Sequence, residues 1–454
     1  MTLMIRGGRV LDPATATDRI LDVYVEDGAV KRIGEGLKEQ AQETIDASGM
    51  YVMPGFVDMH VHLRDPGQTD KESIETGAAA AAKGGYTSIV AMPNTKPVVD
   101  NSDVLSYVLN KGRSVTPVHV YQAGAVTVGM AGEALTDLAD MAAHGAIAFS
   151  EDGKSVASTK LCWDALHELA RLDLPLLDHC EEKTLMGNGI INEDENCVRL
   201  GLPGIHNTVE NVIASRDYLL ATEAGARLHL CHCSTKEVVH MLRLAKQTGS
   251  ALTAEVCPHH FTLTSDDIPD APWSKNAQGE GQETPTLSAS PMNREGLDMV
   301  NYKMNPPLRT REDRDALIEG LLDGTVDCVA TDHAPHSAEE KAGGLAKSLN
   351  GIVGLECAFP VLYTALVKSG KVPLEVLLNA MCVNPRRIFR FPGGRIAEGQ
   401  PADLTVLRLD RKHTVDPAEF RSRGRATPFE GWEVYGEIVM TVCNGEIVYR
   451  GEGV

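Results

Sequence analysis

Short apolar runs separated by longer helix-like stretches dominate the middle of the chain. Eight such runs can be counted: Gly55–Met59, Thr87–Met92, Val118–Ala123, Ala146–Phe149, Leu174–Leu177, Arg227–Cys231, Ala251–Val256 and Val326–Ala330. This alternation is typical of βα units with a buried parallel sheet. Eight parallel strands with intervening helices close into a barrel. The pattern therefore predicts an α/β fold, a (β/α)8 TIM barrel over residues 54–394.

The two ends of the chain have a different pattern. Residues 1–53 and 395–454 contain short apolar stretches, such as Met4–Val10 and Ala402–Leu407, between Gly and Asp residues. Short strands bounded by such turn residues predict an all-β unit. We expect the two ends to meet in one small composite β-sandwich domain beside the barrel.

One segment interrupts the βα rhythm. Residues 266–300 are polar and rich in Gly, Pro and Gln. Loops of this length inside a compact domain are uncommon and are either functional covers or mobile decoration. The segment predicts a long excursion between the seventh and eighth strands.

Composition and charge narrow the range of partners. The chain of 454 residues has a formal net charge of −20, which disfavours nucleic acid and anionic membranes as partners. No basic segment followed by an apolar run opens the sequence, and no apolar run is long enough to span a bilayer. The ten cysteines are scattered without zinc-ribbon spacing, as is typical of a reducing compartment. We therefore expect a cytoplasmic protein, in which an anionic substrate needs a local positive site.

A histidine pair follows the first predicted strand. His60 and His62 are two residues apart, so that both imidazoles point to one side of an extended chain and can reach one metal ion. By itself the pair is equally compatible with a surface turn.

Other strand ends carry side chains of the same type. Asp152, His179, His232 and Asp332 follow the fourth, fifth, sixth and eighth apolar runs. Catalytic residues of such barrels lie at the carboxyl ends of the strands. A polar residue at one strand end needs no special explanation, but the whole set is hard to explain by structure alone. Four histidines and two aspartates suffice for two metal ions with one bridging carboxylate.

Five motifs together resemble those of the dihydroorotases in the amidohydrolase superfamily. The motifs are Gly55–Gly67, which contains His60-Val61-His62-Leu63-Arg64-Asp65-Pro66-Gly67, and Met92–Thr95, Phe149–Gly153, Lys303–Arg309 and Thr331–His336. His-x-His alone marks only the superfamily, whereas Leu-Arg-Asp-Pro-Gly combined with Asp-His-Ala-Pro-His is much narrower. The similarity extends over nearly the whole chain.

This resemblance implies a set of metal ligands. His60, His62 and Asp332 would bind one divalent ion, His179 and His232 would bind a second, and both ions are expected to be Zn²⁺. Many relatives bridge their ions with a carboxylated lysine on the fourth strand, but Ala146–Phe149 contains no lysine. The aspartate-bridged bacterial dihydroorotases use a carboxylate instead.

Asp152 matches that bridging aspartate. Glu151 is the lesser candidate for the same role. Lys154 is read as a loop residue, although the sequence leaves a carboxylated lysine there open.

The resemblance also implies how a ring carboxylate of the substrate is held. Arg64 can pair with it bidentately, Asn94 and His336 match positions that hold it in the family, and Asn305 matches a residue that contacts the ring. Two structural alternatives stay open: an ion pair between Arg64 and Asp65, and turn capping by Asn94.

The implied activity is reversible hydrolysis of the cyclic amide of L-dihydroorotate to N-carbamoyl-L-aspartate, a step of de novo pyrimidine biosynthesis. Asp332 would move the proton from the attacking water to the leaving ring nitrogen. Hydrolysis of another cyclic ureide, as by hydantoinases or allantoinases, is the nearest alternative. An inactive scaffold for aspartate carbamoyltransferase is a second, but such homologues typically lack metal ligands. Besides the small-molecule substrate, we expect a homodimer and allow for a complex with aspartate carbamoyltransferase.

Overall fold

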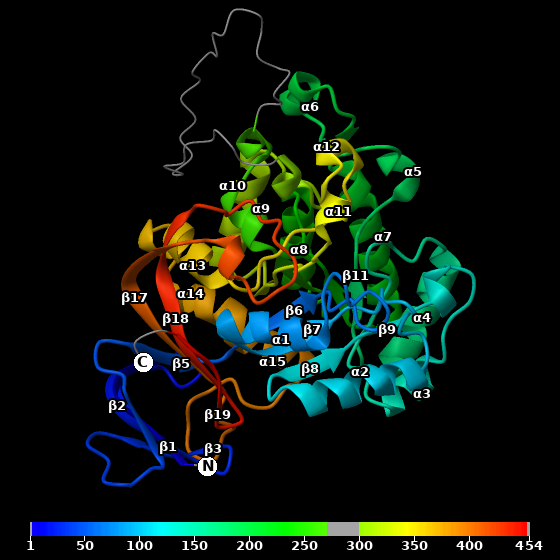
Figure 1. Cartoon of the computed structure of the whole chain (residues 1–454). Coiled ribbons are helices and arrows are strands. Elements are labelled where there is room, and N and C mark those ends of the chain that lie inside the picture. Colours follow the sequence, from blue (N-terminus) through cyan, green and yellow to red (C-terminus); the bar gives the residue numbers. More distant parts are fainter. Residues whose placement is uncertain (1, 270–298, 452–454) are drawn as a thin grey trace, which may run out of the picture.

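The computed structural model describes residues 2–269 and 299–451, and its larger part is a barrel of parallel strands (Figure 1). Its strands are β6 (Phe56–Val61), β7 (Tyr86–Ala91), β8 (His119–Gln122), β10 (Phe149–Ser150), β11 (Leu176–Asp178), β14 (Leu228–Leu230), β15 (Thr253–Val256) and β16 (Cys328–Val329). Each overlaps one of the eight predicted runs, so the barrel prediction is confirmed. Most of the predicted excursion at 266–300 lies outside the described residues.

Backbone pairing closes the ring. Strands β6, β7 and β8 form one parallel sheet, and β9 (Gly124–Ala125) continues the chain from β8 into a second sheet of order β16-β15-β14-β11-β10-β9. On the other side, a parallel bridge joins Val61 to His333, and the His62 amide donates to the His333 carbonyl oxygen at 2.9 Å. The carboxyl ends of all these strands therefore meet at one mouth.

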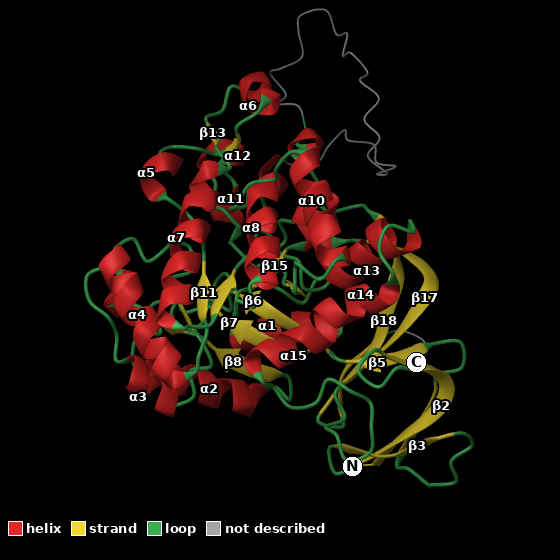
Figure 2. Ribbon diagram, turned by 180° about the vertical axis from the view of Figure 1, so that it is seen from behind, coloured by secondary structure: helices red, strands yellow, loops and turns green. Residues whose placement is uncertain are grey.

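Helices surround the strands (Figure 2). They include α1 (Ile74–Lys83), α2 (Ser102–Val115), α3 (Leu138–Ala143), α4 (Thr159–Leu172), α7 (Thr208–Ala224), α8 (Lys236–Gln247), α10 (Arg311–Leu322), α13 (Ala358–Leu362), α14 (Leu374–Leu378) and α15 (Asn384–Phe389). Short helices α5 (Lys183–Met186), α6 (Glu195–Leu200), α9 (Pro258–Thr262), α11 (Ala338–Lys341) and α12 (Gly344–Lys347) lie in the connections.

Local sequence explains where these helices begin and which face they bury. Helix α10 begins at a capping box in which Thr310 and Asp313 satisfy each other's backbone amides. Helix α8 buries Val238, Leu242 and Ala245, which share one side at helical spacing. No helix within the described residues has the length and apolar character needed to cross a membrane.

Both ends of the chain contribute to one further sheet. Its strand order is β19-β18-β17-β5-β1-β2-β3, with β4 paired to β1. The strands are β1 (Thr2–Asp12), β2 (Thr17–Glu26), β3 (Ala29–Gly34), β4 (Glu43–Asp46), β5 (Tyr51–Pro54), β17 (Leu404–Thr414), β18 (Glu433–Cys443) and β19 (Glu446–Arg450). The antiparallel pairing of β5 with β17, from Leu404 opposite Pro54 to Leu407 opposite Tyr51, joins the two ends.

This small domain has its own apolar core, to which Ile5, Val23 and Val52 contribute from the first end and Leu404 and Val442 from the last. The expected composite β-domain is therefore present. Further along β17 and β18, Leu407, Leu409 and Ile438 pack into the barrel core instead. The domain limits at 53/54 and 394/395 stay a prediction, because β17 and β18 contribute residues to the cores of both the sheet and the barrel.

Candidate metal centre and active site

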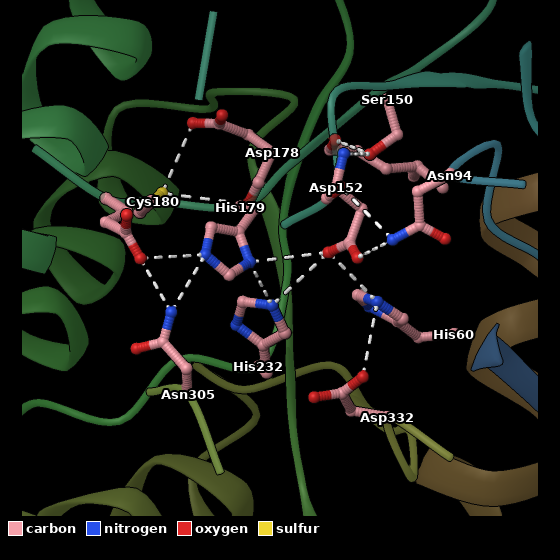
Figure 3. A network of polar contacts seen from close by, with 12 residues as sticks. His60, Asn94, Ser150, Asp152, Asp178, His179, Cys180, His232, Asn305 and Asp332 are labelled. Atoms are coloured by element: carbon pink, nitrogen blue, oxygen red, sulfur yellow. Dashed lines mark hydrogen bonds and ion pairs between the residues drawn. The ribbon is translucent and has the colours of Figure 1, made fainter. Parts of the chain in front are cut away.

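The six predicted metal ligands converge at the carboxyl mouth of the barrel, and Figure 3 labels all of them except His62. His60 lies in β6 and His62 directly after it, whereas the others follow their strands by one to three residues: Asp152 after β10, His179 after β11, His232 after β14 and Asp332 after β16. All six side chains are buried. Residues spread over most of the chain thus form one cluster.

Asp152 lies at the centre of this cluster. Its Oδ1 is 3.1 Å from His60 Nε2, 3.4 Å from His179 Nδ1 and 3.6 Å from His232 Nε2, and its Oδ2 is 3.3 Å from His62 Nε2. One carboxylate therefore faces all four histidines, which is the arrangement that a bridging ligand requires.

Asp332 lies beside the first histidine pair. Its Oδ1 is 3.0 Å from His62 Nε2 and 3.7 Å from His60 Nε2. These three residues form one group of closely spaced donor atoms, and His60, Asp152 and His232 form another. His179 Nδ1 adjoins the second group, 2.9 Å from His232 Nε2.

The donor atoms themselves fit cations. Among the described residues, the buried His60 Nε2 and Asp152 Oδ1 have no hydrogen-bond partner, although they lie 3.1 Å apart. His179 Nδ1 and His232 Nε2 face each other, so at most one of these two nitrogens can carry a hydrogen atom that points at the other. Neutral imidazoles and carboxylates at such spacing are the ligands of zinc and similar ions.

The electrostatics favour positive charge on His60 and His179, whereas burial lowers the pKa of His62. Burial disfavours a protonated His60, but the Asp152 carboxylate outweighs burial and raises the pKa of His60 well above its usual range. Burial likewise opposes ionisation of Asp152, yet the positive charge of His60 and the ring nitrogens of His179 and His232 beside its Oδ1 hold its pKa well below the usual range. The same balance raises the pKa of His179 to about 10.

Two neighbours of Asp152 point elsewhere. Glu151 Oε1 accepts a hydrogen bond from the Thr127 backbone amide at 2.5 Å, and Lys154 Nζ donates to the Met130 carbonyl oxygen at 2.7 Å. Neither reaches the histidines in this arrangement.

A pocket of about 250 Å³ opens beside the predicted metal ligands, and Arg64, Asn94, Asn305 and His336 line it. All four predicted substrate-binding residues are therefore brought to one pocket. The arrangement can hold a small anionic ring next to the histidines.

Arg64 is the cation of this pocket. Asp65 does not pair with it, because the Asp65 carboxylate accepts hydrogen bonds from Lys111 Nζ at 2.7 Å and Tyr107 Oη at 3.0 Å. The Arg64 Nε donates to the Pro335 carbonyl oxygen at 3.2 Å, and no carboxylate of residues 2–269 or 299–451 forms an ion pair with the guanidinium. Its other N–H groups are available to an anion.

The two amide side chains of the pocket contact predicted metal ligands. Asn94 Oδ1 lies 2.9 Å from His62 Nδ1, and its Nδ2 donates to Asp152 Oδ2 at 3.4 Å. Turn capping alone therefore does not account for the side-chain contacts of Asn94. Asn305 Nδ2 donates to Glu181 Oε2 at 2.6 Å and lies 3.4 Å from His179 Nε2.

Both ring nitrogens of His336 lie near acceptor oxygens, Nδ1 at 2.9 Å from Glu340 Oε2 and Nε2 at 2.8 Å from the Asn350 carbonyl oxygen, and a neutral ring can donate to only one of them. Burial and the nearby Arg64 charge lower its pKa to about 4. A neutral imidazole at this position adds no second charge to that of Arg64.

Sequence reasoning missed Glu255, which lies in β15 and contacts His60 Nδ1 at 2.8 Å. Burial opposes its ionisation, but hydrogen bonds from His229 and His60 outweigh burial, and the pKa of Glu255 lies well below its usual range. A single acidic residue inside the apolar run Ala251–Val256 was the available signal. Glu181, two residues beyond His179, was also missed and carried no comparable signal.

Solved structures share the overall fold of this chain. The L-hydantoinase of Arthrobacter aurescens superposes with a TM-score of 0.83 at 27% sequence identity, covering 99% of this chain and 96% of that one. The dihydropyrimidinase of Brevibacillus agri gives a TM-score of 0.80 at 22% identity over 99% and 95%, which supports the fold alone. This chain is a hydrolase of cyclic amides.

Sequence relatives narrow the class to one family. A family profile described as "Dihydro-orotase-like" matches residues 49–238. The dihydroorotase of Halalkalibacterium halodurans is 44% identical over 450 residues, 99% of each chain, and that of Geobacillus sp. WCH70 is 42% identical over 451 residues, again 99% of each. The chain belongs to the dihydroorotase family.

Proposed function

We propose that this protein is a metal-dependent dihydroorotase, which reversibly hydrolyses L-dihydroorotate to N-carbamoyl-L-aspartate in de novo pyrimidine biosynthesis. The observation that carries the proposal is the buried Arg64 guanidinium, which has no acidic partner among the described residues and lines the same pocket as the ligand cluster. A ring carboxylate distinguishes dihydroorotate from hydantoin and allantoin, and a free guanidinium is suited to bind it bidentately.

The proposed cofactor is a pair of divalent ions, both Zn²⁺. His60, His62 and Asp332 would hold one, His179 and His232 the other, and Asp152 would bridge them. When bound, such ions polarise the scissile carbonyl and lower the pKa of water so that it attacks near neutral pH. Among the residue contacts, the position of Asp152 between all four histidines supports the assignment.

Asp332 is the proposed catalytic residue. Its carboxylate would accept a proton from the attacking water and deliver it to the ring nitrogen as the C–N bond breaks. Arg64, with Asn94 and His336, would orient the ring carboxylate, and Asn305 would contact the ring. Fixing the ring in this way holds the amide carbon against the ligand cluster, where the reaction takes place.

Two assays test the proposal. Purified protein should contain about two equivalents of zinc and should turn over dihydroorotate far faster than hydantoin or allantoin. Preference for hydantoin or allantoin would place the protein with the other cyclic-ureide hydrolases. Absence of both metal and turnover would support the inactive scaffold, which the six ligand-type residues argue against.

The assembly and the compartment are further parts of the proposal. By family resemblance we propose a cytoplasmic homodimer, which sedimentation of the purified protein would test. Co-purification with aspartate carbamoyltransferase would test the proposed complex with that enzyme.

A further inference from the structure

Glu255 is an unusual residue for its place in the fold. Part of the barrel interior is an apolar cluster that includes Met59, Val90, Leu177 and Cys328. The Glu255 side chain is 1% exposed. Burying a carboxylate in such surroundings costs free energy unless hydrogen bonds and charge partners compensate.

Glu255 makes two of its compensating contacts with proposed metal ligands. Glu255 Oε1 is 2.8 Å from His60 Nδ1 and accepts a hydrogen bond from the His232 backbone amide at 3.4 Å. An ionised carboxylate only accepts hydrogen bonds, so His60 must carry its proton on Nδ1. A neutral His60, the form that binds a metal ion, then has its lone pair on Nε2, the atom that faces Asp152.

The other oxygen of the Glu255 carboxylate contacts a further histidine ring, that of His229. Glu255 Oε2 lies 3.2 Å from His229 Nε2, and His229 Nδ1 lies 2.8 Å from Thr253 Oγ1. The side chains of His229 and Glu255 are both completely or almost completely buried. This chain of contacts fixes the carboxylate with respect to β14 and β15, so that it can in turn fix the ligands.

We propose that Glu255 is a positioning residue that sets the metal affinity of both halves of the centre, through the His60 ring for one ion and the His232 backbone for the other. The proposal rests on the function proposed above. A carboxylate behind a ligating imidazole fixes the tautomer, orients the ring and makes the ligand more basic. Its negative charge also offsets part of the positive charge that two divalent ions bring into a buried site.

The test is Glu255→Gln, which keeps the shape and removes the charge. The amide has only one acceptor oxygen, so it cannot accept from both His60 and His229. We expect zinc affinity, measured by chelator competition at fixed pH, to fall about 10- to 100-fold. The d–d spectrum of the cobalt-substituted protein should change as well, because the ligand field of His60 is altered.

Asp403→Asn is the matched control. Asp403 is also a buried carboxylate paired with a histidine, 3.0 Å from His119 Nε2, but the pair lies at the start of β8 and of β17, away from the strand-end cluster. This variant should lower the melting temperature and leave zinc affinity within about 2-fold of wild type. A purely structural role for Glu255 predicts the same behaviour for both variants.

Unchanged zinc affinity and an unchanged cobalt spectrum in Glu255→Gln would overturn the proposal, even if the melting temperature fell. Should that variant fail to fold, Glu255→Asp decides instead: it keeps the charge but retracts it by one methylene, and wild-type zinc affinity in it would equally overturn the inference. If wild-type protein binds no metal, the proposed function fails first. If wild type binds zinc and turns over dihydroorotate, the result for Glu255 stands on its own.

Discussion

Two buried aspartates at opposite ends of the barrel show how differently one side chain can be used. Asp403, next to the small domain, has a partner for each oxygen: His119 Nε2 lies 3.0 Å from Oδ2, and the Asn444 amide donates to Oδ1 at 2.8 Å. Asp152 has no hydrogen-bond partner for its Oδ1 among the described residues, although three histidine nitrogens surround that atom. A saturated carboxylate holds the fold together, whereas an unsaturated one among histidines indicates a cation site.

The largest effect is expected at the catalytic mouth, from Asp332→Asn. The amide keeps the shape of the side chain but cannot accept the proton of the attacking water, so kcat should fall by at least about 10²- to 10⁴-fold. Steady-state kinetics and a circular dichroism spectrum would check turnover and folding together. A folded variant with a near-wild-type rate would contradict the proton-transfer role.

Asp152→Ala tests whether the Asp152 carboxylate, unlike that of Asp403, binds metal ions. Because Asp152 faces both halves of the cluster, its removal should release at least one ion per chain, as measured by elemental analysis, whereas Lys154→Ala should retain both. Activity after metal reconstitution should not depend on added bicarbonate, since a carboxylate side chain needs no CO₂. Bicarbonate dependence that disappears in the Lys154 variant would overturn this assignment.

Arg64→Met removes the only charge of the pocket that we assign to the substrate carboxylate. A lost charge-assisted contact is worth about 1.5–3 kcal/mol, so kcat/KM for dihydroorotate should fall about 10- to 150-fold, mainly through KM. Zinc content should be unchanged. Wild-type kinetics in this variant would mean that the substrate carboxylate is held elsewhere.

The smallest effect on activity is expected from Asp403→Asn at the opposite end. The variant should lose about 1–3 kcal/mol of stability at neutral pH and keep wild-type kcat. Although burial opposes ionisation of Asp403, its hydrogen bond with His119 lowers its pKa. Its stabilisation is therefore complete above the unfolded pKa of about 3.9 and is lost as the pH falls through the lower folded value. Urea unfolding at pH 7 and pH 3 should show the difference between variant and wild type shrink in acid.

The barrel was predictable because its signal is local. Each strand is a short apolar run, and the residues that end those runs, such as His179 and His232, converge wherever eight parallel strands close. The choice of Asp152 over Glu151 as the bridging residue came from the family motif, because the apolar pattern favours neither. Only the fold shows that Glu151 accepts a hydrogen bond from the Thr127 backbone amide.

Other features depend on contacts that no local pattern encodes. His232 and Asp332 have positive φ angles of 33° and 47°, a backbone conformation that side chains rarely adopt and that the surrounding barrel must enforce. Glu255 is recognisable as important only when His60, far away in sequence, is seen beside it. The pairing of β5 with β17 is equally remote from any local signal.

That last pairing has a consequence for the order in which the protein assembles. Strands β1 to β5 are synthesised first, yet the edge of β5 finds its partner only when β17 has been made, after the entire barrel. Until then a strand edge with free backbone groups is open to other chains. A nascent chain halted between α15 and β17 would carry the eight barrel strands beside a sheet that lacks β17, β18 and β19. Such chains, rather than the finished protein, are where aggregation during synthesis should begin.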